Sequence, residues 1–540
     1  MINSVPPERR DYLRTPMSRG NTMSNHTGTP SRRQFQLGLG AAAAAASLAP
    51  GLARAQGARS ANLAMIGEPQ SLDPMASTAD LVSIIVQHIY ESLYTFDAAW
   101  NVKPMLASHM PKVSPDGKLY TIPLRKGVKL HNGREMDSED VVASLKRWLA
   151  MTARGKALSA EIVSITATDA STVEIALKTV QPALLAHLGL PSGFAGIMAK
   201  ESIADNLTQF IGTGPYKFVE RRPDQYVVLS KFEDYAARSE APSGYAGKRE
   251  AKIAELRFIP VPNANTRVEG LIAGQYHFSD QLPVESNKKV AAASSARAVL
   301  TMPYGFPYFP TNTKQGPFAD VKVRQAFQMC LNDEEIMLAG FGDPKFFALA
   351  AEHFPKGSSF YSEAGKDKYN KGDAAGAKKL LAETKYDGTP IRILNSKQYD
   401  FHNRMALVMA EQMKEAGFKV QLDVVDWATL VQRRNDPALW DIYITHAAFL
   451  PEPMLVPPQL GDGAPGWWKT PAKDATLAAF NGEADAAKRG VLWGPVQQAI
   501  YDEVPYIRPG NFAALLGTSA KMKDFTPMPW PAFWNVDLSA

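Results

Sequence analysis

The chain has 540 residues, of which 45% are hydrophobic, and a formal net charge of +5 at pH 7. Seven of the 59 basic residues and two of the 54 acidic residues fall in positions 1–55, so the rest of the chain carries 52 of each sign and no net charge. The charge excess therefore gives no support to nucleic-acid binding, which requires basic residues concentrated in the folded part. The single cysteine, Cys330, excludes an internal disulfide and every metal site built from several cysteines.

Residues 1–55 have the pattern of an export signal. Arg32 and Arg33, in Ser-Arg-Arg-Gln-Phe, precede an alanine- and glycine-rich apolar run over 37–52, which ends in Ala53-Arg54-Ala55. This order predicts a twin-arginine signal peptide with cleavage near Gln56, and either Met17 or Met23 could be its true start. The run is shorter than the roughly 20 residues of a spanning helix, which argues against a membrane anchor. Because no cysteine follows the run, we expect no lipid anchor and a mature protein that is soluble in the periplasm.

About 485 residues remain after the signal, enough for two or three domains. Residues 62–66 are predicted to form a short strand, and the apolar spacing of 80–93 predicts a helix that carries His88. We expect His88 to be a hydrogen-bonded core residue. Asp137 or Ser138 caps a further predicted helix, and residues 161–180 alternate as strands do.

The residue pattern of 301–331 changes from that of a strand to that of a helix near its middle. Residues 304–310 alternate aromatic residues with prolines and glycine, which predicts an extended strand. Asp320 is a suitable N-cap for a helix whose apolar face includes Cys330, so we expect a core thiol there. Further helices are predicted over 373–381, 404–417 and 490–501, and a strand over 419–425.

Catalytic motifs are missing from the sequence. It contains no Gly-x-Ser-x-Gly, no His-Glu-x-x-His and no phosphate loop, and its nine histidines are scattered. His131-Asn132-Gly133 has no second ligand at metal-binding spacing and is interpreted as a turn. Gly212-Thr213-Gly214 is followed by Pro215, which prevents the helix that a dinucleotide-binding loop requires. We therefore expect no enzyme, no cofactor and no metal. The alternative is a periplasmic hydrolase or redox enzyme that is exported folded by the twin-arginine route.

Several motifs resemble one known family and occur in its order. They are Tyr90-Glu91-Ser92-Leu93, Pro104-Met105-Leu106-Ala107, Leu124-Arg125-Lys126-Gly127-Val128, Gly212-Thr213-Gly214-Pro215-Tyr216, Pro317-Phe318-Ala319-Asp320 and Val323-Arg324-Gln325-Ala326. The chain resembles the extracellular solute-binding proteins of the peptide/nickel type, family 5, the capture subunits of ABC importers.

The resemblance implies an α/β, two-lobed periplasmic-binding-protein fold of the large type, with a discontinuous first lobe and a ligand cleft between the lobes. Lobe I would comprise 56–305 with 506–540 returning to it, and lobe II would comprise 306–505. The aromatic strand and the segment 504–510 would be the two crossings. The resemblance also implies a small-molecule ligand, peptide-like or other, and a cognate membrane permease with its ATPase subunits. We expect a monomer that binds no nucleic acid.

The candidate ligand-binding residues are Thr78, Tyr304, Phe306, Trp427, His446, Phe449 and Trp467.

Phe449 suggests which ligands this protein does not bind. In many peptide-binding relatives the loop at this position reads Trp-x-x-Asp-Tyr-x-x-Pro, and its aspartate pairs with the free α-amine of the peptide. Aligned on Glu452-Pro453, the present sequence has Phe449 in place of that aspartate, with His446 as a candidate polar contact. A shift of the alignment would bring Asp441 or Glu452 into the role. An ammonium group buried without a charged partner is costly, so ordinary di- and oligopeptides are not expected to be the physiological ligand.

Export should depend on the two adjacent arginines of the signal, because the twin-arginine receptor recognises that pair. Replacing both Arg32 and Arg33 with lysine keeps the charge, and we expect unprocessed precursor to accumulate in the cytoplasm. Fractionation and immunoblotting of the wild type and the double variant measure this. Normal processing of the variant in the periplasm would contradict the assignment.

Overall fold

The computed structural model describes residues 59–397, 399–455 and 460–539. The predicted signal peptide lies outside these residues. Residues 58–540 form one compact unit. Within the described ranges, no helix is both long enough and apolar enough to cross a membrane.

A ten-stranded mixed sheet is the backbone of the unit. Its order is β17-β12-β19-β11-β1-β10-β9-β8, and β13 pairs with β19 while β18 pairs with β12. Strands far apart in the sequence are therefore neighbours. The bounds are β1 Ser60–Met65, β8 Tyr216–Arg222, β9 Tyr226–Lys231, β10 Glu255–Pro260, β11 Phe278–Leu282, β12 Ala296–Pro310, β13 Phe347–Ala348, β17 Thr445–Ala448, β18 Tyr506–Ile507 and β19 Asn511–Ser519.

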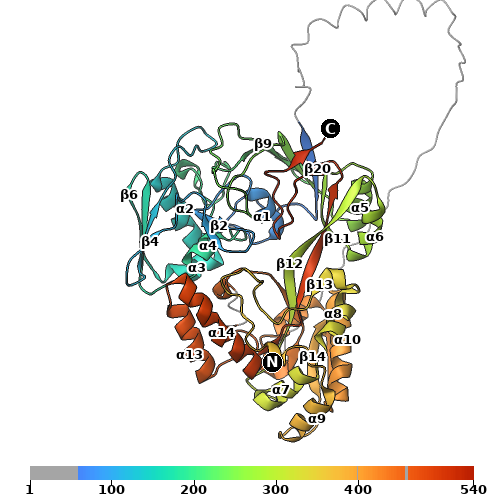
Figure 1. Ribbon diagram of the computed structural model, residues 1–540. Helices are drawn as coiled ribbons and strands as arrows, with labels where there is room; N and C mark the ends of the chain where they lie inside the picture. The colour runs from blue at the N-terminus through green and yellow to red at the C-terminus, as the bar shows by residue number, and fades with distance from the viewer. Residues whose placement is uncertain (1–58, 398, 456–459, 540) are drawn as a thin grey trace, which may run out of the picture. The chain divides into compact units, whose positions relative to one another are not determined.

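Two long strands, β12 and β19, run together from the upper to the lower half of the molecule in Figure 1. They pair in antiparallel fashion from Ala296↔Ser519 to Gly305↔Phe512. We call the part that contains β1–β11 and the C-terminal residues 511–539 the first lobe, and the part that contains α7–α14 the second lobe. The C-terminal segment joins the first lobe through hydrogen bonds such as that from Phe533 N–H to the ring atom Nε2 of His88, 2.9 Å.

The first lobe adds a four-stranded antiparallel sheet and two small ladders to the main sheet. The four-stranded order is β4-β5-β7-β6, while β2 pairs with β3 and β20 with β21. Helices α5 and α6 pack near β11 and β12 at the right of Figure 1. The bounds are β2 Tyr94–Phe96, β3 Val102–Pro104, β4 Lys112–Val113, β5 Leu119–Pro123, β6 Ile162–Asp169, β7 Thr172–Leu177, β20 Met522–Lys523, β21 Asp537–Leu538, α1 Asp80–Val86, α2 Ser138–Met151, α3 Ala153–Ser159, α4 Leu184–Gly189, α5 Ala264–Ile272 and α6 Asn287–Ala292.

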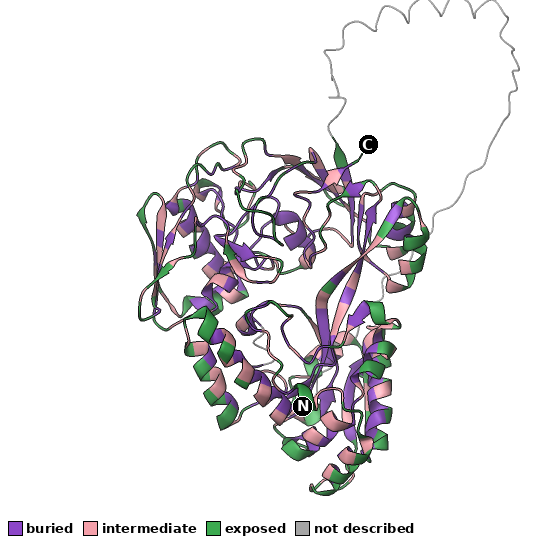
Figure 2. Cartoon of the chain, viewed as in Figure 1, coloured by how far each residue is buried: buried purple, intermediate pink, exposed green. Residues whose placement is uncertain are grey.

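The second lobe has its own apolar core around a three-stranded parallel sheet of order β15-β14-β16. Helix α10 packs on β14 and β15, and the outer faces of the helices are exposed (Figure 2). The bounds are α7 Val321–Cys330, α8 Asp333–Phe341, α9 Ala374–Ala382, β14 Ile391–Ser396, α10 Asp400–Glu415, β15 Val420–Val425, α11 Trp427–Arg433, β16 Ile442–Tyr443, α13 Pro471–Gly482 and α14 Ala486–Glu503. Short 3-10 helices lie at Lys200–Ser202, Val284–Ser286, Pro317–Ala319, Pro344–Phe346, Lys366–Lys368, Pro437–Leu439 and Pro453–Leu455.

Several expected local features are confirmed. Asp137 caps α2 in a capping box with Asp140, and Asp320 caps α7 by accepting from Lys322 N–H, 2.9 Å. Cys330 is buried on the apolar face of α7. His88 is fully buried, with one ring nitrogen 2.9 Å from the carbonyl oxygen of Ile84.

The prediction of a helix over 80–93 was wrong in its length, since α1 ends at Val86. The carbonyl oxygens of His88 and Ile89 accept from Tyr216 N–H at 3.0 Å and Gly214 N–H at 2.9 Å. The segment that leads into β8 thus occupies two carbonyl oxygens that a longer helix would have used for its own backbone hydrogen bonds. The apolar spacing continues past residue 86 because the residues beyond the helix are buried as well.

The same contact explains the two glycines of Gly212-Thr213-Gly214. A Cβ atom at Gly212 would lie 2.1 Å from the carbonyl oxygen of Ile89, and one at Gly214 would lie 2.3 Å from that of His88. Two backbone segments approach too closely here for any side chain. The motif is therefore a packing requirement of the first lobe, because glycine alone permits such an approach.

Gly214→Ala should destabilise the protein by about 1–3 kcal/mol or more, because the clash is with rigid backbone. Gly67→Ala is the matched control in the same lobe, since its Cβ would meet no atom within 4 Å. Urea unfolding of the two variants measures the difference, and the control should stay within about 0.5 kcal/mol of the wild type. Equal stability of both variants would contradict the close approach.

Candidate functional site

A pocket lies where β12 leaves the first lobe and enters the second. Side chains alternate between the two faces of a strand, so Phe306 of β12 shares a face with Ala447 of β17, its register partner. Phe449 follows β17, and its N–H donates to the carbonyl oxygen of Tyr304, 3.0 Å. Phe306 and Phe449 line the same pocket, together with His353, Phe354, Trp493 and Arg508.

Aromatic rings from both lobes meet at this pocket. The ring of Phe449, which is 1% exposed, lies 5.5 Å from that of Trp100 of the first lobe and 6.3 Å from that of Phe354. Ser359 of the second lobe donates to the side-chain oxygen of Asn101, 2.8 Å, beside Trp100. The two lobes therefore contact each other here, and the pocket is mainly apolar.

The two carboxylates that a shifted alignment would place here are both engaged in ion pairs. Glu452 is buried and pairs in bidentate fashion with Arg489, at 2.6 and 2.7 Å. Asp441 is buried and accepts from the Nε and NH2 atoms of Arg392, at 2.9 and 3.1 Å. Each carboxylate already has its cation, so neither is free to bind the amine of a ligand.

His446 lies on the other face of the sheet from Phe306, because its register partner is Pro307. Its Nδ1 atom is 3.0 Å from Nε2 of the buried His402, and burial lowers the pKa of His446 to about 4. Trp427 belongs to the same cluster, with its ring 5.7 Å from that of His402. The structure thus brings His446 and Trp427 together and does not bring His446 to the pocket that Phe449 lines.

Tyr304 ties the crossing to the first lobe. Its hydroxyl accepts from Gln281 Nε2, 2.9 Å, and donates to the carboxylate of Asp80, 3.4 Å, which also accepts from Trp530 Nε1, 2.7 Å. Burial raises the pKa of Asp80. Thr78 is exposed just before this network, and its carbonyl oxygen accepts from Ser192 Oγ, 3.0 Å.

Trp467 lies apart from these groups, stacked on Trp440 with ring centroids 5.5 Å apart. It lines a second, smaller pocket with Tyr308 and Trp468. The candidate residues therefore lie in four separate groups. Only the pocket that contains Phe306 and Phe449 brings two candidate residues together with residues of both crossing segments.

Sequence reasoning missed the other walls of this pocket. His353, Phe354, Trp493 and Arg508 come from three separate segments, and no periodicity links them to Phe449. The segment 504–510 was expected to be the return crossing, but its role in lining a pocket had no signal in the sequence. In the described ranges, no three His, Cys, Asp or Glu side chains group closely enough to hold a metal ion.

The fold and the pocket define a two-lobed α/β solute-binding protein of the periplasmic type. The model of the family described as bacterial extracellular solute-binding proteins, family 5 Middle, matches residues 101–461, and the chain belongs to this family. The description of this family and the names of the relatives below are those of binding proteins.

The chain is 28% identical to the probable peptide ABC transporter periplasmic-binding protein y4tO of Sinorhizobium fredii, over 94% of this chain and 99% of that protein. It is 26% identical to the glutathione-binding protein GsiB of Pectobacterium atrosepticum, over 85% and 90% of the respective chains. Among solved structures, HbpA2 from Haemophilus parasuis superposes with a TM-score of 0.76 at 21% identity, over 89% of this chain and all of that one.

Glu452→Gln should lower the free energy of unfolding by about 3–5 kcal/mol, because it leaves the buried Arg489 without its counter-ion. Glu411→Gln is the control, since Glu411 and its partner Lys414 are largely exposed, and such a pair contributes about 0–1 kcal/mol. Denaturant unfolding measures both. A Glu452→Gln variant that is as stable as the wild type would instead leave Glu452 available to a ligand.

Proposed function

We propose that the protein captures a small solute between its two lobes in the periplasm and delivers it to a membrane permease with its ATPase subunits. The observation that carries the proposal is the aromatic pocket at the crossing, whose Phe449 packs against Trp100 of the first lobe. Aromatic rings offer a large rigid contact area at low entropic cost. The cavity holds only about 20 Å³ in this structure, so a solute enters it only as its walls move apart. A solute seated there would contact both lobes and favour the closed arrangement by hinge motion.

The proposal includes three further points. The mature protein begins near Gln56 after export through the twin-arginine route, it carries no lipid anchor, and it acts as a monomer. The arginine pair of the signal and the absence of a cysteine after the apolar run support the first two. We also propose the division of the chain into lobe I (56–305 and 506–540) and lobe II (306–505), which the pairing of β12 with β19 and the separate apolar core of the second lobe support.

The ligand we propose is not an ordinary peptide with a free α-amine. Aligned on Glu452-Pro453, Phe449 falls where the resemblance implies an aspartate in many peptide-binding relatives, and Asp441 and Glu452 both form ion pairs within the second lobe. An ammonium group brought to this pocket would lose its water without gaining a carboxylate, which costs several kcal/mol. An apolar or aromatic ligand group suits the rings that line it.

Ligand binding should be measurable as stabilisation. A solute that binds only the folded protein raises the free energy of unfolding by about 2.7 kcal/mol at 100 times its Kd. We expect at least one class among amino acids, opines, aromatic acids, sugars and nickel chelates to raise the melting temperature. The protein is first unfolded and refolded to remove any ligand carried through purification. If no class raises the melting temperature, the solute-binding proposal fails for this chain.

Peptides give the sharper test of the pocket. Calorimetry with a mixed library of di- to pentapeptides should show weak binding at most, and N-acetylation of the same peptides should not reduce it. The physical reason is the missing acidic partner at Phe449. Tight binding that acetylation abolishes would show that an acidic anchor exists elsewhere in the cleft. The variant Phe449→Asp serves as the comparison, since it should gain affinity for the free amines and not for the acetylated forms.

A further inference from the structure

One wall of the aromatic pocket carries an unusual charge. The guanidinium of Arg508 lies over the ring of Phe306, with Cζ 4.0 Å from the ring centroid. Arg508 is 7% exposed, and burial lowers its pKa to about 10, so it remains a cation at neutral pH. It stands on the return crossing between β18 and β19, where the two lobes meet.

Protein groups satisfy this cation only in part. NH1 donates to the carbonyl oxygen of His353, 2.8 Å, and NH2 donates to the side-chain oxygen of Asn511, 2.6 Å. A guanidinium has five N–H donors, and the buried Nε–H of Arg508 has no acceptor among the described residues. These residues also give Arg508 no ion pair with a carboxylate. Glu352 acts on it electrostatically without a direct bond.

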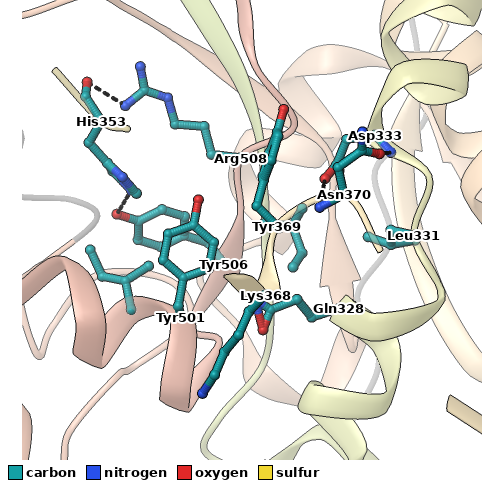
Figure 3. A pocket seen from close by; sticks show the side chains of 12 residues that line it. Gln328, Leu331, Asp333, His353, Lys368, Tyr369, Asn370, Tyr501, Tyr506 and Arg508 are labelled. Atoms are coloured by element: carbon teal, nitrogen blue, oxygen red, sulfur yellow. Dashed lines mark hydrogen bonds between the residues drawn. The ribbon is translucent and has the colours of Figure 1, made fainter. Parts of the chain in front are cut away.

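Figure 3 shows how the side chain is directed. The guanidinium points toward His353 and away from Asp333, whose carboxylate accepts from Asn370. His353 is held by its own ring contact with the Tyr506 hydroxyl, 3.1 Å. Burial keeps the pKa of His353 well below its usual range, so its imidazole is neutral. His353 therefore leaves the net charge beside Arg508 unchanged.

Arg267 shows how the same protein satisfies a buried guanidinium that has no acidic partner. Its Nε, NH1 and NH2 atoms all donate to backbone carbonyl oxygens, those of Asp280, Val261 and Gln281 among them, at 2.7–2.9 Å. Arg267 lines none of the pockets described above. Arg508 differs in both respects, because it keeps a donor free and borders a pocket.

We infer that Arg508 binds a carboxylate group of the transported solute, whose apolar part lies against Phe306, Phe354 and Phe449. The planar donors of arginine match the two oxygens of a carboxylate, and a hydrogen bond between charged groups is stronger than one between neutral groups. Among the described residues the site offers one positive charge and no second cation, which favours a carboxylate over a phosphate monoester with close to two negative charges. The inference rests on the proposed function, and it reverses the charge expected for the anchor of a peptide α-amine.

The test uses matched sets of probe molecules that have the same apolar group and differ in charge. Examples are phenylacetate with phenylacetamide, indole-3-acetate with its amide, and N-acetylphenylalanine with its amide and its methyl ester. We expect the carboxylates to raise the melting temperature and to bind, by calorimetry, at least about tenfold more tightly than their neutral partners. The esters test the wild-type protein without any substitution, so the result does not depend on a variant that folds poorly.

Arg508→Gln removes the charge and should erase the preference for the carboxylates. Arg508→Lys keeps the charge without the planar donors and should retain part of the preference. Arg267→Gln is the control, because it also removes a buried arginine but should leave the preference unchanged in the folded fraction.

Equal or tighter binding of the amides and esters would overturn the inference, as would a carboxylate preference that Arg508→Gln retains. If a phosphate monoester with the same apolar group binds more tightly than the carboxylate, the choice of a carboxylate is overturned. If another class of solute stabilises the protein while none of the carboxylates does, the inference about Arg508 fails and the solute-binding function stands. If no solute of any class does, both fail.

Discussion

The antiparallel pairing of β12 with β19 is the constraint on which the rest of the structure depends. Its register runs from Ala296↔Ser519 to Gly305↔Phe512 with a shift between Thr301 and Gly305, so the pairing extends from the first lobe to the boundary of the second. A ladder of this kind limits how the lobes can move, because any closure must bend the strands and not separate them. It also places residues about 200 positions apart in the sequence side by side, which is how Phe306 comes to lie under Arg508.

The alternation of side chains along this ladder decides which residues can share a pocket. Phe306 and Phe449 face the junction of the lobes, whereas His446 faces the cluster of His402 and Trp427 on the opposite side. A shift of one residue in the register would exchange these faces. The pocket is therefore defined as much by the pairing of β12 with β17 as by the chemistry of the side chains.

Charge is distributed in this protein according to a consistent physical rule. Buried carboxylates such as Asp73 and Glu452 are each matched by a bidentate arginine, Arg147 and Arg489 respectively. Such matching is expected, because an unpaired buried ion has a large desolvation cost. Arg508 departs from this rule at the place where a solute would be held. Arg267 and Asp333 are also buried without an ion pair among the described residues, so the inference depends on the place of Arg508 beside the pocket and on its unsatisfied Nε–H, and not on the missing carboxylate alone.

The sequence by itself determined the local elements and the class of protein. The cap at Asp320 and the apolar face that carries Cys330 depend on residues a few positions apart, so the pattern is sufficient to predict them. The pattern left the cap of α2 open between Asp137 and Ser138, and the structure assigns it to Asp137. The family motifs, which follow their usual order, likewise identified the fold. Helix α1 was predicted too long because its end is imposed by Gly214 and Tyr216, which the helix sequence does not contain.

Only the tertiary structure decided which charges are already paired and which are free. Asp441, Glu452 and Arg508 look equally available in the sequence. Asp441 and Glu452 pair with arginines 49 and 37 residues away, whereas Arg508 has no ion pair with a carboxylate among the described residues. The reason is that electrostatic pairing depends on distance and burial in space, and a one-dimensional pattern contains neither. The direction of a side chain across a sheet is likewise fixed by the strand that it pairs with.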